Sequence, residues 1–166
     1  MPKPILPDLL KPHLKVVFCG RAVGLESACQ GYYYANAMNK FWPILHEVGF
    51  TPTLLQPHEY PKLLDEGLGL TDSVKYITGS DKHIPVSDKD ISILKKKISR
   101  YQPKILAFNG KTPAKGFLNC KKVSYGKQEQ KVGHTKIWVL PSTSPVAGKY
   151  WNPDHWKKLK KIADKL

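Results

Sequence analysis

Three short apolar runs restrict the folds that this sequence can adopt. They are Val16 to Cys19, Lys104 to Phe108 and Lys136 to Leu140, and each has the length of a buried strand. Between them lie stretches with apolar residues at helical spacing, such as Asn39 to Val48. Buried strands that alternate with helices are typical of a parallel sheet with helices on both faces. The sequence therefore predicts an α/β protein.

Caps and helix-breaking residues indicate the remaining elements. Ser87 precedes Asp90 by three residues, which is typical of a capping box at the start of a helix. Further helices are expected over Pro57 to Leu64, from Thr112-Pro113, and from Asn152-Pro153 to Leu166, with a tight loop over Gly67 to Asp72. Repeated prolines predict an extended arm over residues 1–13. Residues 1–166 as a whole fit one domain.

The charge of the chain points to a polyanionic partner. Its 27 basic and 13 acidic residues give a net charge of +14, which favours nucleic acid through Coulomb attraction and counterion release. A merely basic protein, or one that meets an anionic membrane surface, has the same composition. No apolar run approaches the ~20 residues that a membrane span needs.

The cysteines and histidines indicate the redox environment and the metal content. The three cysteines form no CxxC pair, which favours a reduced, intracellular protein. The six histidines do not cluster with cysteines or acids at ligand spacing, so we expect no metal.

The loops that follow the apolar runs are the expected ligand site. They are Gly20 to Gly24, Asn109 to Lys111 and Ser142 to Lys149. In a parallel sheet such loops meet at one edge, where ligands bind. Tyr32-Tyr33-Tyr34 adds flat faces for a planar ring. Together with the positive charge, these features predict a nucleobase pocket in a protein that holds DNA.

Several motifs resemble those of one enzyme family. The stretch Leu14 to Gly20, together with Gly24 and Asn39-Lys40-Phe41-Trp42, resembles the first motif region of the mismatch-specific uracil/thymine DNA glycosylases, which belong to the uracil-DNA glycosylase superfamily. Their second motif region is similar to Trp138 to Ser144. Between the two regions, Leu63-Leu64-Asp65, Gly69-Leu70-Thr71 and Gly110-Lys111 also fit in order.

This resemblance implies a fold and an activity. The fold is a three-layer αβα sandwich around a mostly parallel, four-stranded central sheet. The activity is hydrolysis of a base–sugar bond in DNA after the damaged nucleotide has been flipped into a pocket, with no cofactor. Because one base-flipping domain can act alone, we expect a monomer. The expected location is intracellular, in the cytoplasm at the nucleoid if the source is bacterial.

Two departures from the family pattern affect the expected chemistry. The family loop reads Gly-Ile-Asn-Pro-Gly and uses its Asn to position the attacking water, whereas Ala22 occupies that place here. The second motif, Asn-Pro-Ser-Gly, becomes Ser142 to Pro145. A branch of the superfamily that acts on deaminated purines also lacks the first Asn, and it relies on the Asn before Phe-Trp, which is Asn39 here.

Asn39 and Asp72 are therefore the candidate catalytic residues. Asn39 would position water or the base, although an Asn there also suits a helix cap. Asp72 follows the Gly-Leu-Thr motif that the family places beside the pocket, and its carboxylate could act as a base toward water. The alternative for Asp72 is a turn or cap residue.

The remaining candidates would hold the base and the DNA. The expected base-binding residues are Gly20, Arg21, Ala22, Tyr34 and Ser142, with Tyr34 as the stacking platform. The expected DNA-binding residues are Ser144, Val146, Ala147, Gly148 and Lys149, with Val146 as the wedge that enters a base step. The alternative is an ordinary strand-to-helix turn.

The sequence thus predicts a monofunctional DNA glycosylase for uracil, with the other deaminated bases hypoxanthine and xanthine as further candidate substrates. The alternative is a catalytically weak or inactive module of the same fold that binds DNA or damaged bases. A Rossmann-type nucleotide site is disfavoured because Gly20 to Gly24 lacks the Gly-x-Gly-x-x-Gly spacing.

Overall fold

A five-stranded sheet forms the centre of the protein in the computed structural model, which describes residues 3–78 and 85–166. The strands are β1 (Val16–Gly20), β2 (Leu68–Asp72), β3 (Ile105–Asn109), β4 (Gly126–Val132) and β5 (Thr135–Leu140), in the spatial order β2-β1-β3-β5-β4. β4 pairs antiparallel with β5, and the other neighbours are parallel. The expected α/β class and mostly parallel sheet are confirmed, whereas the expectation of four strands was wrong.

Two strands of the sheet, β2 and β4, are not among the three apolar runs of the sequence. β4 has the sequence GKQEQKV and lies half-exposed at the edge of the sheet, so burial imposes no apolar pattern on it. The stretch expected to form a tight loop, Gly67 to Asp72, contains β2 instead. A Cβ atom at Gly69 would lie 2.5 Å from the carbonyl oxygen of Leu9 and 2.7 Å from Leu14. Gly69 therefore permits close packing within a strand and does not mark a turn.

The helices lie largely where the sequence places them. They are α1 (Leu25–Gln30), α2 (Phe41–Glu47), α3 (Asp88–Tyr101), α4 (Lys111–Leu118) and α5 (Pro153–Ala163), with the 3-10 helices η1 (Pro57–Glu66) and η3 (Pro145–Tyr150). The capping box of Ser87 and Asp90 is confirmed at the start of α3. α1 and η3 are too short to give a periodic signal.

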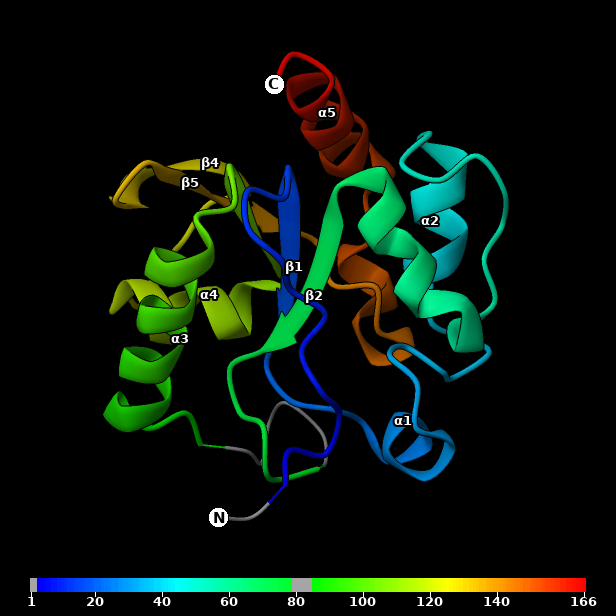
Figure 1. Ribbon diagram of the computed structural model, residues 1–166, viewed down its shortest axis with the longest axis horizontal. Helices are drawn as coiled ribbons and strands as arrows, with labels where there is room; N and C mark the ends of the chain where they lie inside the picture. Colours follow the sequence, from blue (N-terminus) through cyan, green and yellow to red (C-terminus); the bar gives the residue numbers. More distant parts are fainter. Residues whose placement is uncertain (1–2, 79–84) are drawn as a thin grey trace.

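The sheet carries an apolar core on each face. Val16 and Phe18 of β1 face a core that α2 and α5 complete, and Val17 and Cys19 face a second core under α3 and α4. The two groups of helices lie on opposite sides of the strands in Figure 1. The Phe18 ring stacks on Trp156 of α5 with centroids 5.7 Å apart. These layers fix the strand ends on which the site is built.

The carboxyl ends of the parallel strands share one edge of the sheet. The arrowheads of β1 and β2 point to the side where α1 and the N-terminus lie in Figure 1. Gly20 is paired with Asp72 at the ends of these two strands, and Asn109 is paired with Leu140 at the ends of β3 and β5. Across residues 3–78 and 85–166, the structure contains no helix with the length and apolarity needed to cross a bilayer.

Candidate functional site

Gly20, Asp72 and Tyr34 come together at the end of β1. Asp72 is a buried residue with only 4% of its surface exposed. A Cβ atom on Gly20 would stand 2.9 Å from Oδ1 of Asp72 and 3.4 Å from the hydroxyl oxygen of Tyr34. The absence of a side chain at Gly20 is therefore what allows the carboxylate and the phenol to approach the end of the strand.

Aromatic packing determines which face of Tyr34 can meet a ligand. The Tyr34 ring stacks on Phe41 with centroids 4.0 Å apart and planes inclined by 22°. Phe41 thus covers one face, and only the opposite face can stack on a base. Phe41 and Trp42 are buried in the core. Tyr33 is the neighbouring tyrosine that packs inward, whereas Tyr32 is partly exposed.

A hollow of about 430 Å³ lies beside Tyr34. Its lining includes Tyr32, Tyr34, Asn36, Asn39 and His58. Within the described part of the chain, Gly20, Asp72 and Ser142 are not among the lining residues. Tyr34 therefore joins two groups of candidates, because its hydroxyl lies near Asp72 and it lines the hollow together with Asn39.

Asn39 supports the start of α2. Its Oδ1 accepts a hydrogen bond from the backbone N–H of Phe41 at 2.9 Å, which satisfies one of the unpaired donors at the helix start. Lys40 occupies the N-cap position of α2, so the expected cap at Asn39 was wrong by one residue, and Asn39 supports the helix start from the position before the cap. An asparagine side chain also carries two N–H donors, so this contact leaves the Nδ2 group for a ligand.

The loop after β5 folds into the 3-10 helix η3 and presents an apolar tip. Ser142 Oγ accepts a hydrogen bond from the N–H of Ser144 at 3.1 Å, and the Ser144 carbonyl accepts one from the N–H of Ala147 at 3.1 Å. Val146 is 92% exposed. Lys149 is also exposed, with its Nζ 5.0 Å from the centroid of the Tyr150 ring. A Cβ atom on Gly148 would meet no atom within 4 Å, so this part of the loop is open.

Asn109 and Thr143 hold this loop in place. Both lie in loops that the sequence places at the expected ligand site, but neither was predicted to have a role of its own. Nδ2 of Asn109 donates to Thr143 Oγ1 at 2.9 Å, and the N–H of Thr143 donates to Asn109 Oδ1 at 3.0 Å. The carbonyl of Thr143 accepts from the N–H of Lys40, just before α2. A polar residue at the end of an apolar run was the signal that could have identified Asn109.

The loop after β1 continues the pairing of β1 with β2. The carbonyls of Gly20 and Arg21 accept hydrogen bonds from the N–H groups of Ser73 (2.9 Å) and Val74 (2.7 Å). Ala22 is half-buried and offers only a methyl group. Among the described residues, no group of three or more His, Cys, Asp or Glu side chains could hold a metal ion.

Charges around the strand ends are unevenly distributed. Nζ of Lys75 lies 3.6 Å from Oδ2 of Asp72, and both side chains are almost fully buried. Burial raises the pKa of the Cys19 thiol, and the nearby charge of Asp72 raises it further.

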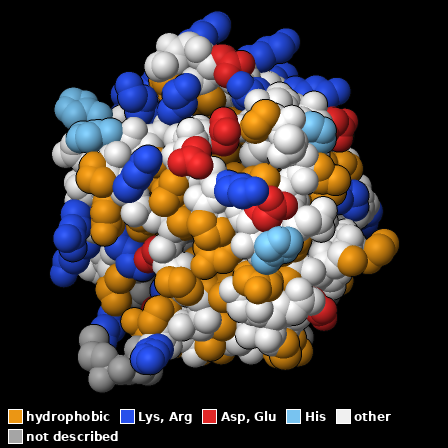
Figure 2. Space-filling view, turned by 45° about the vertical axis from the view of Figure 1, so that its right-hand side comes forward, with side chains coloured by type: hydrophobic (Ala, Val, Ile, Leu, Met, Phe, Trp, Pro, Cys, Tyr) orange, Lys and Arg blue, Asp and Glu red, His pale blue; other side chains and the backbone are white. Residues whose placement is uncertain are grey.

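On the surface, Figure 2 shows Lys and Arg side chains along the top and left of one face, with hydrophobic side chains exposed across its middle.

A family comparison identifies the chain. The model of the uracil DNA glycosylase superfamily matches residues 7–164, which is nearly the whole chain. The protein belongs to the uracil DNA glycosylase superfamily. The resemblance seen in the sequence motifs is thereby confirmed at the level of the superfamily.

A solved structure supports the fold of this superfamily member. It is the solution NMR structure of a protein from Methanosarcina acetivorans that has been proposed to be a uracil DNA glycosylase. The two chains are 16% identical, the match covers 96% of each, and the TM-score is 0.64. At this identity the likeness concerns the fold alone. In the protein described by the present structure, the cluster of Gly20, Asp72 and Tyr34 lies at the edge of the sheet where α/β proteins bind ligands.

Proposed function

We propose that this protein is a monofunctional DNA glycosylase that hydrolyses the N-glycosidic bond of uracil in DNA. We place it nearest to the mismatch-specific uracil/thymine enzymes, with hypoxanthine and xanthine as further candidate substrates. The observation that carries the proposal is the buried carboxylate of Asp72, held at the strand edge between Gly20, Tyr34 and Lys75. Superfamily membership over residues 7–164 supports the reaction class.

In this proposal, Asp72 acts on the water that attacks the sugar. Breaking the bond between C1′ and the base nitrogen leaves the electron pair on the base and positive charge on the sugar. The oxygen of water forms the new bond to C1′, while Asp72 accepts the proton of that water. Lys75, 3.6 Å away, favours the ionised carboxylate that such a base requires. The ionised carboxylate also stabilises the cationic sugar.

The flipped base would be held by the residues around Tyr34. The ring face of Tyr34 that Phe41 leaves uncovered would stack on the base, a contact worth ~1–3 kcal/mol. The Nδ2 group of Asn39 would donate to a base oxygen or to the water. Backbone groups of Gly20, Arg21 and Ala22, and the hydroxyl of Ser142, would complete the base contacts.

Residues 144–149 would contact the DNA. The exposed side chain of Val146 would fill the gap that the flipped nucleotide leaves, which stabilises the extrahelical state. Ser144, Ala147 and Gly148 would approach the backbone, and Lys149 would contact phosphate. A net charge of +14 supports this polyanionic partner. We propose that a single copy of the chain acts on DNA inside the cell.

We propose hydrolysis without a lyase step because the lysine beside the site is already engaged. Nζ of Lys75 contacts Asp8 at 2.9 Å and Asp72 at 3.6 Å. An ammonium group that is paired with carboxylates is a poor nucleophile for a Schiff base.

The test of the proposed function is a base-excision panel. Duplexes that carry uracil, hypoxanthine or xanthine are incubated with the protein, and abasic sites are then cleaved with alkali. We expect strand breaks that require alkali on the uracil duplex. Intact strands on all three substrates would refute the enzyme, and breaks without alkali would refute the monofunctional mechanism.

Ala22 favours a second candidate, a module that binds DNA or damaged bases and cuts weakly or not at all. A methyl group cannot orient water, and Ala22 stands where the resembled family carries its water-positioning Asn. Retarded migration of uracil-containing DNA in a gel, with no release of the base, would favour this alternative.

Two substitutions separate the functional role of Asn39 from its contact with the start of α2. Asn39→Ala should lower the free energy of unfolding by about 1 kcal/mol, because it removes the acceptor for the Phe41 N–H, and should also reduce base release. Asn39→Asp keeps an acceptor for the Phe41 N–H but loses the amide donor. We expect near-normal thermal stability and reduced excision for Asn39→Asp. Wild-type excision by this variant would limit Asn39 to its contact with the helix.

Val146→Ala tests the proposed wedge. The change removes two methyl groups, and at ~0.8 kcal/mol per carbon the extrahelical state should lose about 1.6 kcal/mol, or roughly tenfold in single-turnover rate on duplex DNA. Single-stranded DNA needs no wedge, so its rate should change little. Ile93→Ala, an exposed apolar residue on α3, is the control. Equal losses on both substrates would contradict the wedge.

A further inference from the structure

The segment before β1 is joined to the site by an isolated antiparallel β-bridge. Leu9 and Leu70 of β2 exchange two backbone hydrogen bonds, at 2.9 and 3.0 Å. The N–H of Ile5 donates to the carbonyl of Lys75 at 2.7 Å, beyond the end of β2. This arm covers the free edge of β2 and brings Asp8 beside the residues that follow the strand.

Asp8 links three elements through its carboxylate. Oδ1 accepts a hydrogen bond from the Thr71 hydroxyl at 2.7 Å and lies 2.9 Å from Nζ of Lys75. Oδ2 lies 2.6 Å from Nζ of Lys97 on α3. Burial by itself would raise the pKa of Asp8, but the attraction of Lys75 and the hydrogen bonds from Lys97 and Lys75 outweigh it and hold the pKa below its usual range.

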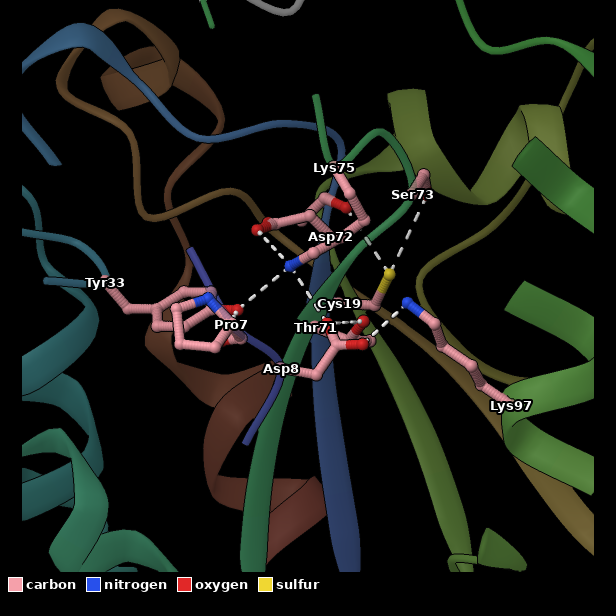
Figure 3. A network of polar contacts seen from close by, with 10 residues as sticks. Pro7, Asp8, Cys19, Tyr33, Thr71, Asp72, Ser73, Lys75 and Lys97 are labelled. Carbon is pink, nitrogen blue, oxygen red and sulfur yellow. Dashed lines mark hydrogen bonds and ion pairs between the residues drawn. The ribbon is translucent and has the colours of Figure 1, made fainter. Parts of the chain in front are cut away.

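Lys75 stands between the two carboxylates. Its side chain is 6% exposed, and it lies 2.9 Å from Asp8 and 3.6 Å from Asp72. It also donates to the hydroxyl of Tyr33 at 3.1 Å, and that hydroxyl donates to the carbonyl of Pro7 at 2.8 Å. Figure 3 shows this ammonium group at the centre of the network, with Asp72 and Asp8 on either side of it.

We propose that Lys75, which follows β2, and Asp8, on the N-terminal arm, are positioning residues for the reaction. Together they set the orientation and the charge of Asp72. Lys75 holds the Asp72 carboxylate in place, and Asp8 limits how strongly Lys75 attracts it. This inference rests on the proposed role of Asp72. It predicts that removal of the Lys75 charge and removal of the Asp8 charge move the acidic limb of the activity–pH profile in opposite directions.

Other titratable and charged groups near Asp72 define the background for this effect. They are Cys19 on β1, Tyr33 and Tyr34 after α1, Lys97 beyond Asp8, and Arg21, whose carbonyl accepts from the N–H of Val74. Burial raises the pKa of Tyr33 and that of Cys19, in both cases reinforced by Asp72, so both groups stay neutral in the working range. Nζ of Lys75 lies 3.6 Å from Oδ2 of Asp72, so its charge acts on that carboxylate at short range.

The signs follow from Coulomb's law. In Lys75→Met, Asp72 loses the positive charge 3.6 Å from its Oδ2 but keeps the negative charge of Asp8 nearby, so the acidic limb of the activity–pH profile should move up by about 1–3 pH units. In Asp8→Asn, Lys75 loses the carboxylate 2.9 Å away and attracts Asp72 more strongly, so the limb should move down, by less than about 1 unit because Asp8 acts through Lys75. Lys62→Met removes a surface lysine that pairs with Glu59, and should leave the limb unmoved.

The folded pKa of Asp8 sets the range in which the test works. Because this pKa is lowered, the stability that Asp8 contributes is present above its usual value of 3.8 and is lost as the pH falls through the lowered value. Asp8 in the wild type therefore stays charged at pH values above 3.8, where the acidic limb is measured.

The experiment measures the wild type, Lys75→Met, Asp8→Asn and Lys62→Met in two ways. Single-turnover uracil release is followed against pH, and the Asp72 carboxyl is titrated by carbon NMR in the same proteins. Opposite shifts for Lys75→Met and Asp8→Asn in both measurements support the proposal. If Lys75→Met does not fold, the downward shift in Asp8→Asn against an unmoved Lys62→Met decides the question.

Failure of this inference and failure of the proposed function give different results. Shifts in the same direction, or no shifts, in proteins that release uracil would overturn the positioning role and leave the glycosylase intact. A wild type that releases no base would refute the proposed function, while the carboxyl titration would still show whether Lys75 and Asp8 control the charge of Asp72.

Discussion

Replacing Asp72 with asparagine is expected to lower the rate of uracil release by about 10²–10⁴-fold, the range that a general base contributes. The amide keeps nearly the shape of the carboxylate, so the space beside Gly20 and Tyr34 stays filled. It cannot accept a proton from water or balance positive charge on the sugar. Lys75 keeps Asp8 as a partner at 2.9 Å, so the variant should still fold.

The measurement is single-turnover release from a uracil duplex at saturating protein, with thermal unfolding recorded alongside. Asp154→Asn is the matched control, because Asp154 is an exposed carboxylate paired with Lys157. We expect wild-type release from this control. A loss below about tenfold in folded Asp72→Asn would show that Asp72 is not the base.

The fold was predictable wherever burial imposes a pattern on the sequence. β1, β3 and β5 are buried and read as apolar runs, and Ser87 and Asn152 cap helices as their positions predict. β4 could not be found this way, because an edge strand exposed to water needs no apolar alternation. No local feature of GKQEQKV predicts an extended conformation. The segment becomes a strand because it pairs with β5.

The candidate site was predictable only in part, because its residues meet through long-range packing. Asp72 and Gly20 were predicted as loop residues near a pocket. Their pairing depends on β2, which was not predicted because Gly67 and Gly69 made the stretch resemble a loop. Lys75 and Asp8 were not selected at all. Their contact joins residues far apart in the sequence, and neither belongs to a recognisable motif.

Asn39 shows why one residue can support two predictions. Its Oδ1 accepts a hydrogen bond from the first N–H of α2, and its position beside Tyr34 in the hollow suits base recognition. Local propensity and a functional role select the same residue type here, so sequence alone could not separate them. The Asn39→Asp variant separates them because aspartate keeps the acceptor and loses the donor.

Replacing Gly20 with alanine is expected to reduce uracil release by roughly 10²-fold, the cost of a small displacement of catalytic groups. The new Cβ would lie 2.9 Å from Oδ1 of Asp72, closer than such atoms pack. The carboxylate has little room to turn away, because Asp72 is only 4% exposed. It must therefore shift away from its place beside the Tyr34 hydroxyl.

Gly24→Ala is the matched control at the other end of the same loop. A Cβ atom there would meet nothing within 4 Å, and Gly24 has the extended φ of −70° and ψ of 163°, which alanine adopts without strain. Release rates and thermal unfolding are measured for both variants. Because overpacking costs about 1–3 kcal/mol, Gly20→Ala should lose some stability but remain folded. Wild-type release by folded Gly20→Ala would mean that the position of the Asp72 carboxylate does not limit the reaction.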